Sequence, residues 1–277
     1  MEWVAVNSEN KLKMSNVSTQ DGVVMISFQS IEHLMGIGRQ GYTSLDPHVV
    51  HLWGIELDGS PSCLEQCAKW LDGEEQHRAA RLVREEDRQR YVLAHGGLRA
   101  VLSRCLGMDP DDIDLSHTVA GKPFVMGKLG GQTAIMFNMS HAHGRALIAV
   151  SKGQEVGVDL ERVRSDLEVA KLSQRYFALS EHTAIMQLTQ EQRAARFFRY
   201  WVAKEAVLKA QGIGLRALSQ CEILLGADGV GAEVLVPAGS LLEHNWGVRV
   251  LSCDEGWEAA VAARGVDWVA QCDLAGC

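Results

Sequence analysis

One short stretch of alternating residues constrains the fold of this chain most. From residue 155 to residue 161 the sequence reads Glu-Val-Gly-Val-Asp-Leu-Glu, so apolar and acidic side chains alternate. Side chains of a strand point alternately to its two faces. The stretch is therefore predicted to be a strand with one apolar face, and its other face carries both Asp159 and Glu161.

Asp159 and Glu161 create an electrostatic conflict on that face. Two carboxylates two residues apart repel each other unless something positive lies between them. A hard divalent cation would resolve the conflict, because carboxylate oxygens are the ligands that magnesium prefers. The alternative is a half-buried strand whose acidic face is simply solvated, and the spacing alone is compatible with both interpretations.

A second stretch, residues 197–210, has the pattern of an amphipathic helix. Its broad stripe of apolar residues places Glu205 in the middle of the face that should pack against the rest of the protein. A buried carboxylate is costly unless it meets a cation or takes up a proton. Glu205 is therefore a third candidate metal ligand; alternatively, it pairs with Lys209, four residues further along the helix.

The rest of the chain predicts an order of strands and helices that occurs twice. A strand at 49–57 precedes helical patterns and then short strands, and the strand at 155–161 does the same. Both strands carry a central glycine, Gly54 and Gly157, so we expect two similar halves. The other predicted segments are helices at about 64–71, 74–106, 167–177 and 180–211, the last broken near Thr189, and strands at about 113–119, 124–125, 133–139, 146–150 and within 217–269.

Residues 1–45 differ from the remainder of the chain. They are rich in Ser, Asn, Gln and Gly and contain one short apolar stretch, from Val23 to Phe28. We expect a loosely attached N-terminal extension with one strand. No function is predicted from its composition.

Composition argues against several classes of protein. The formal net charge is −8, and phosphate contacts need a basic surface, so no nucleic acid is expected as a partner. No run approaches the ~18 apolar residues of a membrane helix. The first residues show no secretory signal, so we expect no membrane association and a cytoplasmic location. The seven Cys residues lack paired C-x-x-C spacing, which favours reduced thiols over structural zinc.

Residues 137–143, Phe-Asn-Met-Ser-His-Ala-His, end an apolar strand with hydroxyl and imidazole groups. His141 is expected to contact a phosphate or to help a proton leave. Zinc binding by His141 and His143 is an alternative, although the sequence places no third ligand.

Four arginines fall on one side of the predicted helix at 74–106, and acidic residues interleave with them. This pattern favours a solvated face with ion pairs. The alternative is an anion site, because the guanidinium fork matches phosphate oxygens. The four residues are Arg78, Arg81, Arg84 and Arg88.

Together these segments resemble the Sfp-type 4′-phosphopantetheinyl transferases. The resemblance rests mainly on the strand from Gly157 to Glu161 and on the helix from Trp201 to Ala210, with the two glycines that follow it. It covers about residues 50–262, and His143 is a departure from the small or polar residue expected there. Further matching segments are Gly121-Lys122-Pro123, Asn138-Met139-Ser140-His141 and, in the long helix, Glu86, Asp87 and Arg90.

The resemblance implies an α+β fold of two similar lobes with pseudo-twofold symmetry and a cofactor cleft between them. The implied lobes are residues 46–153 and 154–277, the second with the magnesium site, after the extension of residues 1–45. Coenzyme A would be the co-substrate. The implied site residues are Asp159, Glu161 and Glu205 for magnesium; Arg78, Lys122, Pro123, Ser140, His141, Asp159 and Lys209 for coenzyme A; and Glu205, Lys209 and His141 for catalysis.

The resemblance also implies the reaction and its partner. A serine of an acyl or peptidyl carrier protein would attack the β-phosphorus of coenzyme A, 3′,5′-ADP would leave, and Glu205 would accept the serine proton. The enzyme would be a monomer, and carriers of fatty-acid, polyketide or non-ribosomal peptide synthesis are all compatible. Because the carrier and this chain are both acidic, docking should depend on a local apolar or basic patch.

Two rival interpretations remain open at this point. The first is another magnesium-dependent phosphotransferase or phosphodiesterase that uses the same acidic residues. The second is a carrier-binding scaffold of the same fold without activity, against which the intact Asp159, Glu161, Glu205 and Lys209 argue.

Overall fold

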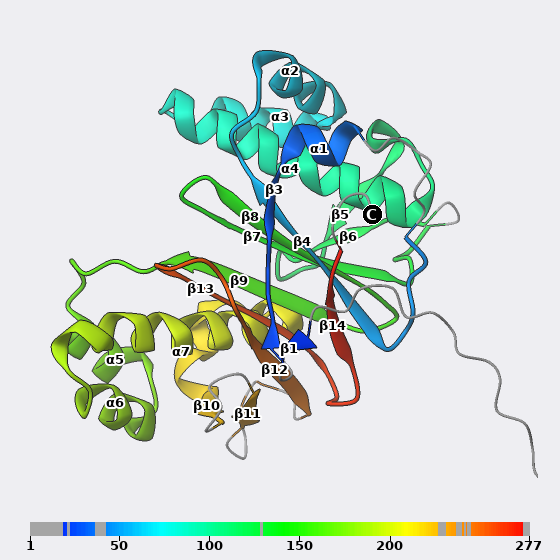
Figure 1. The fold of residues 1–277 in the computed structure, drawn as a ribbon. Coiled ribbons are helices and arrows are strands. Elements are labelled where there is room, and N and C mark those ends of the chain that lie inside the picture. The colour runs from blue at the N-terminus through cyan, green and yellow to red at the C-terminus, as the bar shows by residue number, and fades with distance from the viewer. Residues whose placement is uncertain are drawn as a thin grey trace, which may run out of the picture.

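The computed structural model describes residues 19–20, 23–36, 43–127, 130–226, 231–236, 240, 242 and 245–273. Two five-stranded sheets lie in the middle of the molecule, with α1–α4 above them and α5–α7 below them in the view of Figure 1. The mixed α+β fold expected from the sequence is confirmed.

The first lobe is built on a sheet with the order β14-β4-β8-β7, and β3 also pairs with β4. Buried Trp53, Leu102 and Phe137 belong to the apolar core of this lobe. A separate hairpin is formed by β5 and β6. The strands are β3 (Phe28–Ser30), β4 (Val49–Glu56), β5 (Leu115–His117), β6 (Pro123–Val125), β7 (Ile135–Ala142), β8 (Arg145–Lys152) and β14 (Val269–Cys272), and the helices are α1 (Ile31–Gly36), α2 (Pro61–Trp70), α3 (Gly73–Ala80) and α4 (Glu85–Leu106).

The second lobe has a sheet with the order β10-β11-β12-β13-β9, whose strands are all antiparallel to their neighbours. The long helix α7 packs across β9 and β13, and Phe197, Val207 and Ala260 lie in the core between them. The strands are β9 (Val156–Arg162), β10 (Glu222–Leu225), β11 (Gly231–Leu235), β12 (Trp246–Leu251) and β13 (Trp257–Arg264), and the helices are α5 (Val169–Tyr176), α6 (Leu179–Met186) and α7 (Gln190–Gln211).

The two lobes repeat one order of elements, as the sequence predicted. In each lobe a strand is followed by three helices and then by further strands, and the third helix has 22 residues. Both of these helices end at a glycine in the left-handed conformation, Gly107 (φ 67°) and Gly212 (φ 75°). A third apolar cluster joins the lobes, since it contains Leu52 and Leu147 of the first sheet and Val158 of the second.

The prediction of one helix over residues 74–106 is wrong. The structure has two helices, α3 and α4, and residues 81–84 separate them. The second helix begins with three consecutive acidic residues, Glu85, Glu86 and Asp87, whose charges are stabilised at a helix N-terminus. The predicted break near Thr189 is confirmed, because Thr189 is the N-cap residue of α7.

The prediction of a loosely attached N-terminal segment is wrong for residues 23–36. Ile26 and Ile31 are buried, and the backbone amide of Ile26 donates to the carbonyl oxygen of Ser252 in the second lobe at 2.9 Å. A Cβ atom at Gly54 would lie 2.6 Å from the carbonyl oxygen of Ser27, so this glycine makes room for the N-terminal segment. Of residues 1–22, the structure describes only β1 (Thr19–Gln20), which pairs with β2 (Val23–Val24).

Three smaller expectations concern the chain as a whole. Within the described ranges, no helix is both long enough and apolar enough to cross a membrane. The six described cysteines carry free thiols, as expected. The division into lobes at residue 154 stays a prediction; residues 269–272 return to the first sheet as β14, parallel to β4.

Candidate active site

The candidate site lies where the edge strands of the two sheets, β7 and β9, meet and where α7 packs against β9. The Asn138 side-chain oxygen on β7 accepts from the backbone amide of Val158 on β9 at 2.9 Å, which joins the two edges. A Cβ atom at Gly157 would lie 2.1 Å from the carbonyl oxygen of Ala206 and 2.3 Å from the amide nitrogen of Ala210. The absence of a side chain at Gly157 therefore lets α7 lie directly against β9.

Asp159, Ser140 and Lys209 form a hydrogen-bonded group at this crossing. The Ser140 hydroxyl donates to Asp159 Oδ1 at 2.8 Å, and Lys209 Nζ lies 2.6 Å from the same oxygen. Lys209 also donates to Ser140 Oγ at 3.0 Å. The alternative that Lys209 pairs with Glu205 is thus not borne out, because Lys209 reaches across to the strand and pairs with Asp159.

Glu205 and Glu161 lie within electrostatic reach of Asp159. Burial, followed by the charges of Asp159 and Glu161, raises the pKa of Glu205 to about 7. Burial and then the charge of Asp159 also raise the pKa of Glu161, while Arg164 and Lys209 oppose the rise. The structure therefore brings the three predicted carboxylates together in one electrostatic environment.

Two oxygen atoms of these carboxylates are buried without a hydrogen-bond partner, Asp159 Oδ2 and Glu205 Oε1. Buried carboxylate oxygens are normally paired, so these two atoms are able to accept a cation or a water molecule. In the described part of the chain, no three His, Cys, Asp or Glu side chains form a group that could hold a metal ion by themselves. A cation here would therefore need ligands from a substrate or from water as well, as is usual for magnesium.

His141 and His143 lie at the turn between β7 and β8. His143 (φ 45°) and Gly144 (φ 88°) are both left-handed, as in the two-residue turns that join adjacent strands. Desolvation, with the charges of His95 and Lys209, lowers the pKa of His141, so its ring is neutral near pH 7. The zinc alternative gains no support, since the described residues contain no such metal group.

Arg78 and Arg88 bear out the interpretation as a solvated face with ion pairs, and Arg81 and Arg84 are exposed in the break between α3 and α4. Arg78 pairs with Glu74 at 2.5 Å, and Arg88 pairs with Glu85 at 3.1 Å, all at partly exposed positions. Arg90, one of the residues that carry the family resemblance, lies beside the β7–β8 turn. A Cβ atom at Gly144 would lie 3.6 Å from its guanidinium group.

A pocket of about 160 Å³ opens in the first lobe next to this site. Its lining includes Arg78 and Pro123 from the predicted set, together with His95, His117 and Asn138. Two of these residues, His95 and His117, were not singled out in the sequence, because isolated histidines carry no pattern there. His95 is held by Glu75, whose Oε1 lies 2.8 Å from its Nδ1.

Lys122 points elsewhere. Its Nζ pairs with Glu155 and donates to the carbonyl oxygen of Ala210 at 2.5 Å, near the end of α7. Desolvation lowers its pKa, which the Glu155 carboxylate opposes. In this structure Lys122 joins the two lobes and does not line the pocket of the first lobe.

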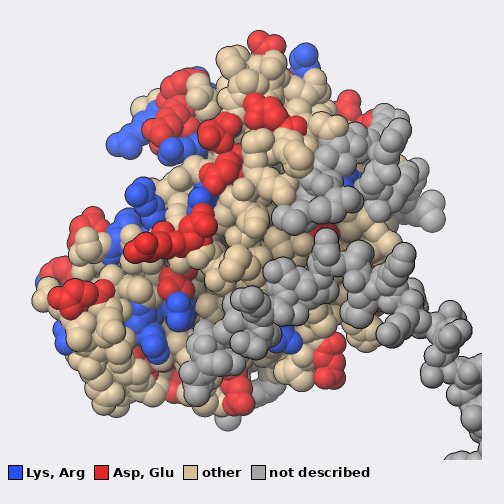
Figure 2. All heavy atoms as spheres, in the orientation of Figure 1, with Lys and Arg blue, Asp and Glu red and all other residues tan. Residues whose placement is uncertain are grey.

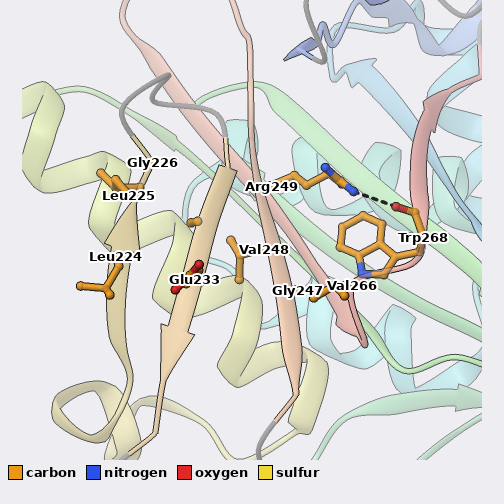
Figure 3. Close-up of a pocket in the computed structure, with 10 residues that line it drawn as sticks. Leu224, Leu225, Gly226, Glu233, Gly247, Val248, Arg249, Val266 and Trp268 are labelled. Carbon is orange, nitrogen blue, oxygen red and sulfur yellow. Dashed lines mark hydrogen bonds between the residues drawn. The ribbon is translucent and has the colours of Figure 1, made fainter.

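A larger hollow than this pocket lies elsewhere on the molecule, and its lining contains none of the predicted residues. It has a volume of about 700 Å³ and lies against β10, β11 and β12. Figure 3 shows the Arg249 guanidinium directed at the carbonyl oxygen of Trp268, to which it donates at 2.9 Å. On the face shown in Figure 2, basic and acidic side chains are intermixed on the left, where the two lobes meet.

A family profile described as "4′-phosphopantetheinyl transferase superfamily" matches residues 155–262, and one described as "4′-phosphopantetheinyl transferase, N-terminal" matches residues 58–153. The 4′-phosphopantetheinyl transferase HetI of Nostoc sp. is 36% identical over 219 residues, which are 79% of this chain and 89% of that protein. The 4′-phosphopantetheinyl transferase Sfp of Bacillus subtilis is 27% identical over 221 residues, 78% of this chain and 93% of that protein.

A solved structure also overlaps part of the chain. The holo-[acyl-carrier-protein] synthase of Thermotoga maritima covers 40% of this chain and 63% of its own, with a TM-score of 0.31 and 19% sequence identity. That overlap is too slight to support a conclusion about the fold.

The chain belongs to the 4′-phosphopantetheinyl transferase superfamily, because the profile matches span both lobes and the resemblance to HetI covers most of both proteins. It is an enzyme that transfers the phosphopantetheine group of coenzyme A to carrier proteins, and its likeness to Sfp confirms the Sfp-type assignment.

Proposed function

We propose that Asp159, Glu161 and Glu205 hold a magnesium ion beside the diphosphate of coenzyme A. The observation that supports this proposal is the pair of buried, unpartnered oxygens, Asp159 Oδ2 and Glu205 Oε1. Hard oxygen ligands on two elements suit magnesium, which usually takes its remaining ligands from phosphate and water. When bound, the ion would neutralise negative charge on the diphosphate.

The remaining predicted residues are proposed to place coenzyme A. The pocket lined by Arg78, Pro123 and Asn138 has about the size of a purine base and opens next to the acidic group. Ser140 and His141 would contact the phosphates; a neutral His141 can donate a hydrogen bond without adding charge.

Lys209 and Lys122 would supply positive charge in different ways. Lys209 is already at the site and would face the diphosphate from α7, held by Asp159 and Ser140. Lys122 would have to leave Glu155 and Ala210 before it could reach a nucleotide phosphate. We therefore assign Lys209 a direct role, and a role of Lys122 requires a change of partners.

The proposed chemistry follows from this arrangement. The carrier serine oxygen forms a bond to the β-phosphorus, the bond from that phosphorus to the leaving oxygen of 3′,5′-ADP breaks, and the serine proton passes to a base. Glu205 is the proposed base, directly or through water; burial and the neighbouring carboxylates raise its pKa to about 7 in the metal-free protein, and a bound cation would lower it. Positioning and electrostatic stabilisation supply most of the rate enhancement in such transfers.

The test is mass spectrometry of an apo carrier protein incubated with the enzyme, coenzyme A and magnesium. A gain of one phosphopantetheine arm is expected, and Asp159→Ala should abolish it while the circular dichroism spectrum stays unchanged. Full transfer by Asp159→Ala would contradict the metal assignment. Release of nucleotide without modification of any carrier would favour another magnesium-dependent phosphotransferase.

The partner and the cellular setting are proposed with the reaction. The enzyme would act as a monomer in the cytoplasm on acyl or peptidyl carrier proteins. A basic group beside the site offers the local patch that an acidic carrier needs, because Arg162, Arg164 and Arg90 all act on His143 at the β7–β8 turn.

A further inference from the structure

A fourth carboxylate lies next to the proposed metal ligands. Strand β13 is antiparallel to β9, and Glu258 is the direct partner of Glu161 in the register. Side chains of directly opposed residues lie on the same face of a sheet, about 5 Å apart at Cβ. Glu258 is only 6% exposed, so water screens its charge weakly.

Glu258 is held by an arginine of the helix that also carries Glu205. Arg199 Nε lies 2.9 Å from Glu258 Oε2, and Arg199 Nη2 lies 3.0 Å from Glu258 Oε1. Paired contacts of this kind, with two parallel N–H donors, are the strongest ion pairs in geometry and energy. Arg199 is six residues before Glu205 on α7, so the contact ties the helix to β13 at one end of the crossing over β9.

The small residues beside Glu258 show that this face of the sheet is close to α7. Ala260 and Ala262 follow it at alternate positions and pair with Asp159 and Gly157 on β9. Both alanines are fully buried in the core of the second lobe with α7. A carboxylate in that setting without a cation would add a full negative charge to the acidic group and would repel an incoming diphosphate.

We propose that Arg199 is a positioning residue that neutralises Glu258, and so keeps the charge of the acidic group at the value that suits one divalent cation together with a diphosphate. The inference rests on the proposed metal site. It differs from that site in its residues, because neither Arg199 nor Glu258 contacts the reacting groups; both act through Glu161 and the placement of α7.

The experiment measures Mn²⁺ binding in the absence of coenzyme A, by electron paramagnetic resonance of free Mn²⁺, for the wild type and five variants. Arg199→Gln makes the group more negative and is expected to tighten Mn²⁺ binding, on the order of threefold. Glu258→Gln leaves the Arg199 positive charge without its carboxylate partner and is expected to weaken Mn²⁺ binding by a similar factor. The double variant, which is neutral at both positions, should return to near the wild-type value.

A second readout and a control separate charge from structure. Arg199→Gln should raise the KM for coenzyme A severalfold with a smaller change in kcat. Loss of the Arg199 positive charge leaves the site more negative, and a more negative site repels the diphosphate. Arg196→Gln removes a positive charge one turn earlier on α7 and should change Mn²⁺ binding less than Arg199→Gln does. Weaker binding in both single variants, or no change in either, would overturn the proposal.

A reference variant keeps this proposal distinct from the metal site itself. Asp159→Asn should abolish Mn²⁺ binding; if it does not, the proposed metal site is wrong. If Asp159→Asn abolishes binding but the two single variants fail to shift it in opposite directions, only the role of Arg199 is wrong. Should Arg199→Gln fail to fold, Glu258→Gln decides alone, since unchanged or tighter binding there contradicts the proposal.

Discussion

Gly157 offers a direct test of whether the crossing of α7 over β9 assembles the site. Gly157→Ala adds one methyl group, and the structure fixes what it would meet. The new Cβ atom would lie 2.1 Å from the carbonyl oxygen of Ala206, 2.3 Å from the amide nitrogen of Ala210 and 2.9 Å from the Cα atom of Ala210. All three are backbone atoms of a helix, so no side chain can rotate away.

The size of the effect follows from these distances. Non-bonded heavy atoms need about 3.3 Å or more, so α7 must move away from β9 by about 1 Å. Overpacking of a core typically costs about 1–3 kcal/mol and more where backbone has to shift, so we expect the free energy of unfolding to fall by about 3 kcal/mol. Because Glu205 and Lys209 are on α7 and Asp159 is on β9, a displacement of about 1 Å should also lower the transfer rate about 100-fold.

Urea denaturation and the rate of carrier modification measure the two effects. Gly73→Ala is the matched control, because a Cβ atom at Gly73 meets nothing within 4 Å at the start of α3. It should be neutral or slightly stabilising, with unchanged activity. If Gly157→Ala kept wild-type stability and rate, the close approach of α7 would not be what assembles the site.

Three further predictions concern the charges of the second lobe. The folded-state pKa of Glu205, about 7, lies above its ordinary value of 4.5, so in metal-free protein the ionised carboxylate lowers stability as pH rises through 7. Glu205→Gln should therefore be about 1–2 kcal/mol more stable than wild type at pH 8.5 and equal to it at pH 4.5, as measured by urea denaturation in EDTA. An equal difference in stability at both pH values would refute this explanation. Lys204 of α7 and Glu181 of α6 form a fully buried ion pair at 2.8 Å. Lys204→Met should lower the free energy of unfolding by about 3–5 kcal/mol, because it leaves the Glu181 charge buried without a partner, and adding Glu181→Leu should recover part of that loss. An equal or larger loss in the double variant, measured by urea denaturation, would contradict this explanation. Carrier modification should stop in EDTA and return with added magnesium, and a rate unaffected by the chelator would contradict the metal assignment.

Local patterns allowed the sequence to predict individual elements and their faces. Alternation over residues 155–161 correctly predicted the strand and put Asp159 and Glu161 on one face, since a strand has a period of two. The polar interruption at Thr189 correctly predicted a helix boundary. The break at 81–84 was missed because the apolar stripe continues through it, and the acidic run that starts the new helix looked like an ordinary solvated face.

The residues whose roles depend on a distant partner were beyond prediction from pattern. The apolar stretch from Val23 to Phe28 predicted a strand but not its attachment to the core, because the partners of Ile26 and Ile31 lie elsewhere in the chain. Lys204 was passed over because a lysine in a helix is normally solvated; only the fold places it against Glu181. The alternative partner considered for Lys209, Glu205, was not borne out for the same reason, since Lys209 pairs with Asp159, a carboxylate far away in sequence.

The sequence by itself determined the candidate ligands Asp159, Glu161 and Glu205 and the face of its element on which each lies, because side-chain type and local periodicity fix both. Tertiary structure decided which faces meet. It brought Asp159 of β9 and Glu205 of α7 into one electrostatic environment. It also placed α7 directly against Gly157 of β9, and it paired Arg199 with Glu258. These outcomes depend on long-range packing, whose geometry is fixed by the whole core and by no single segment.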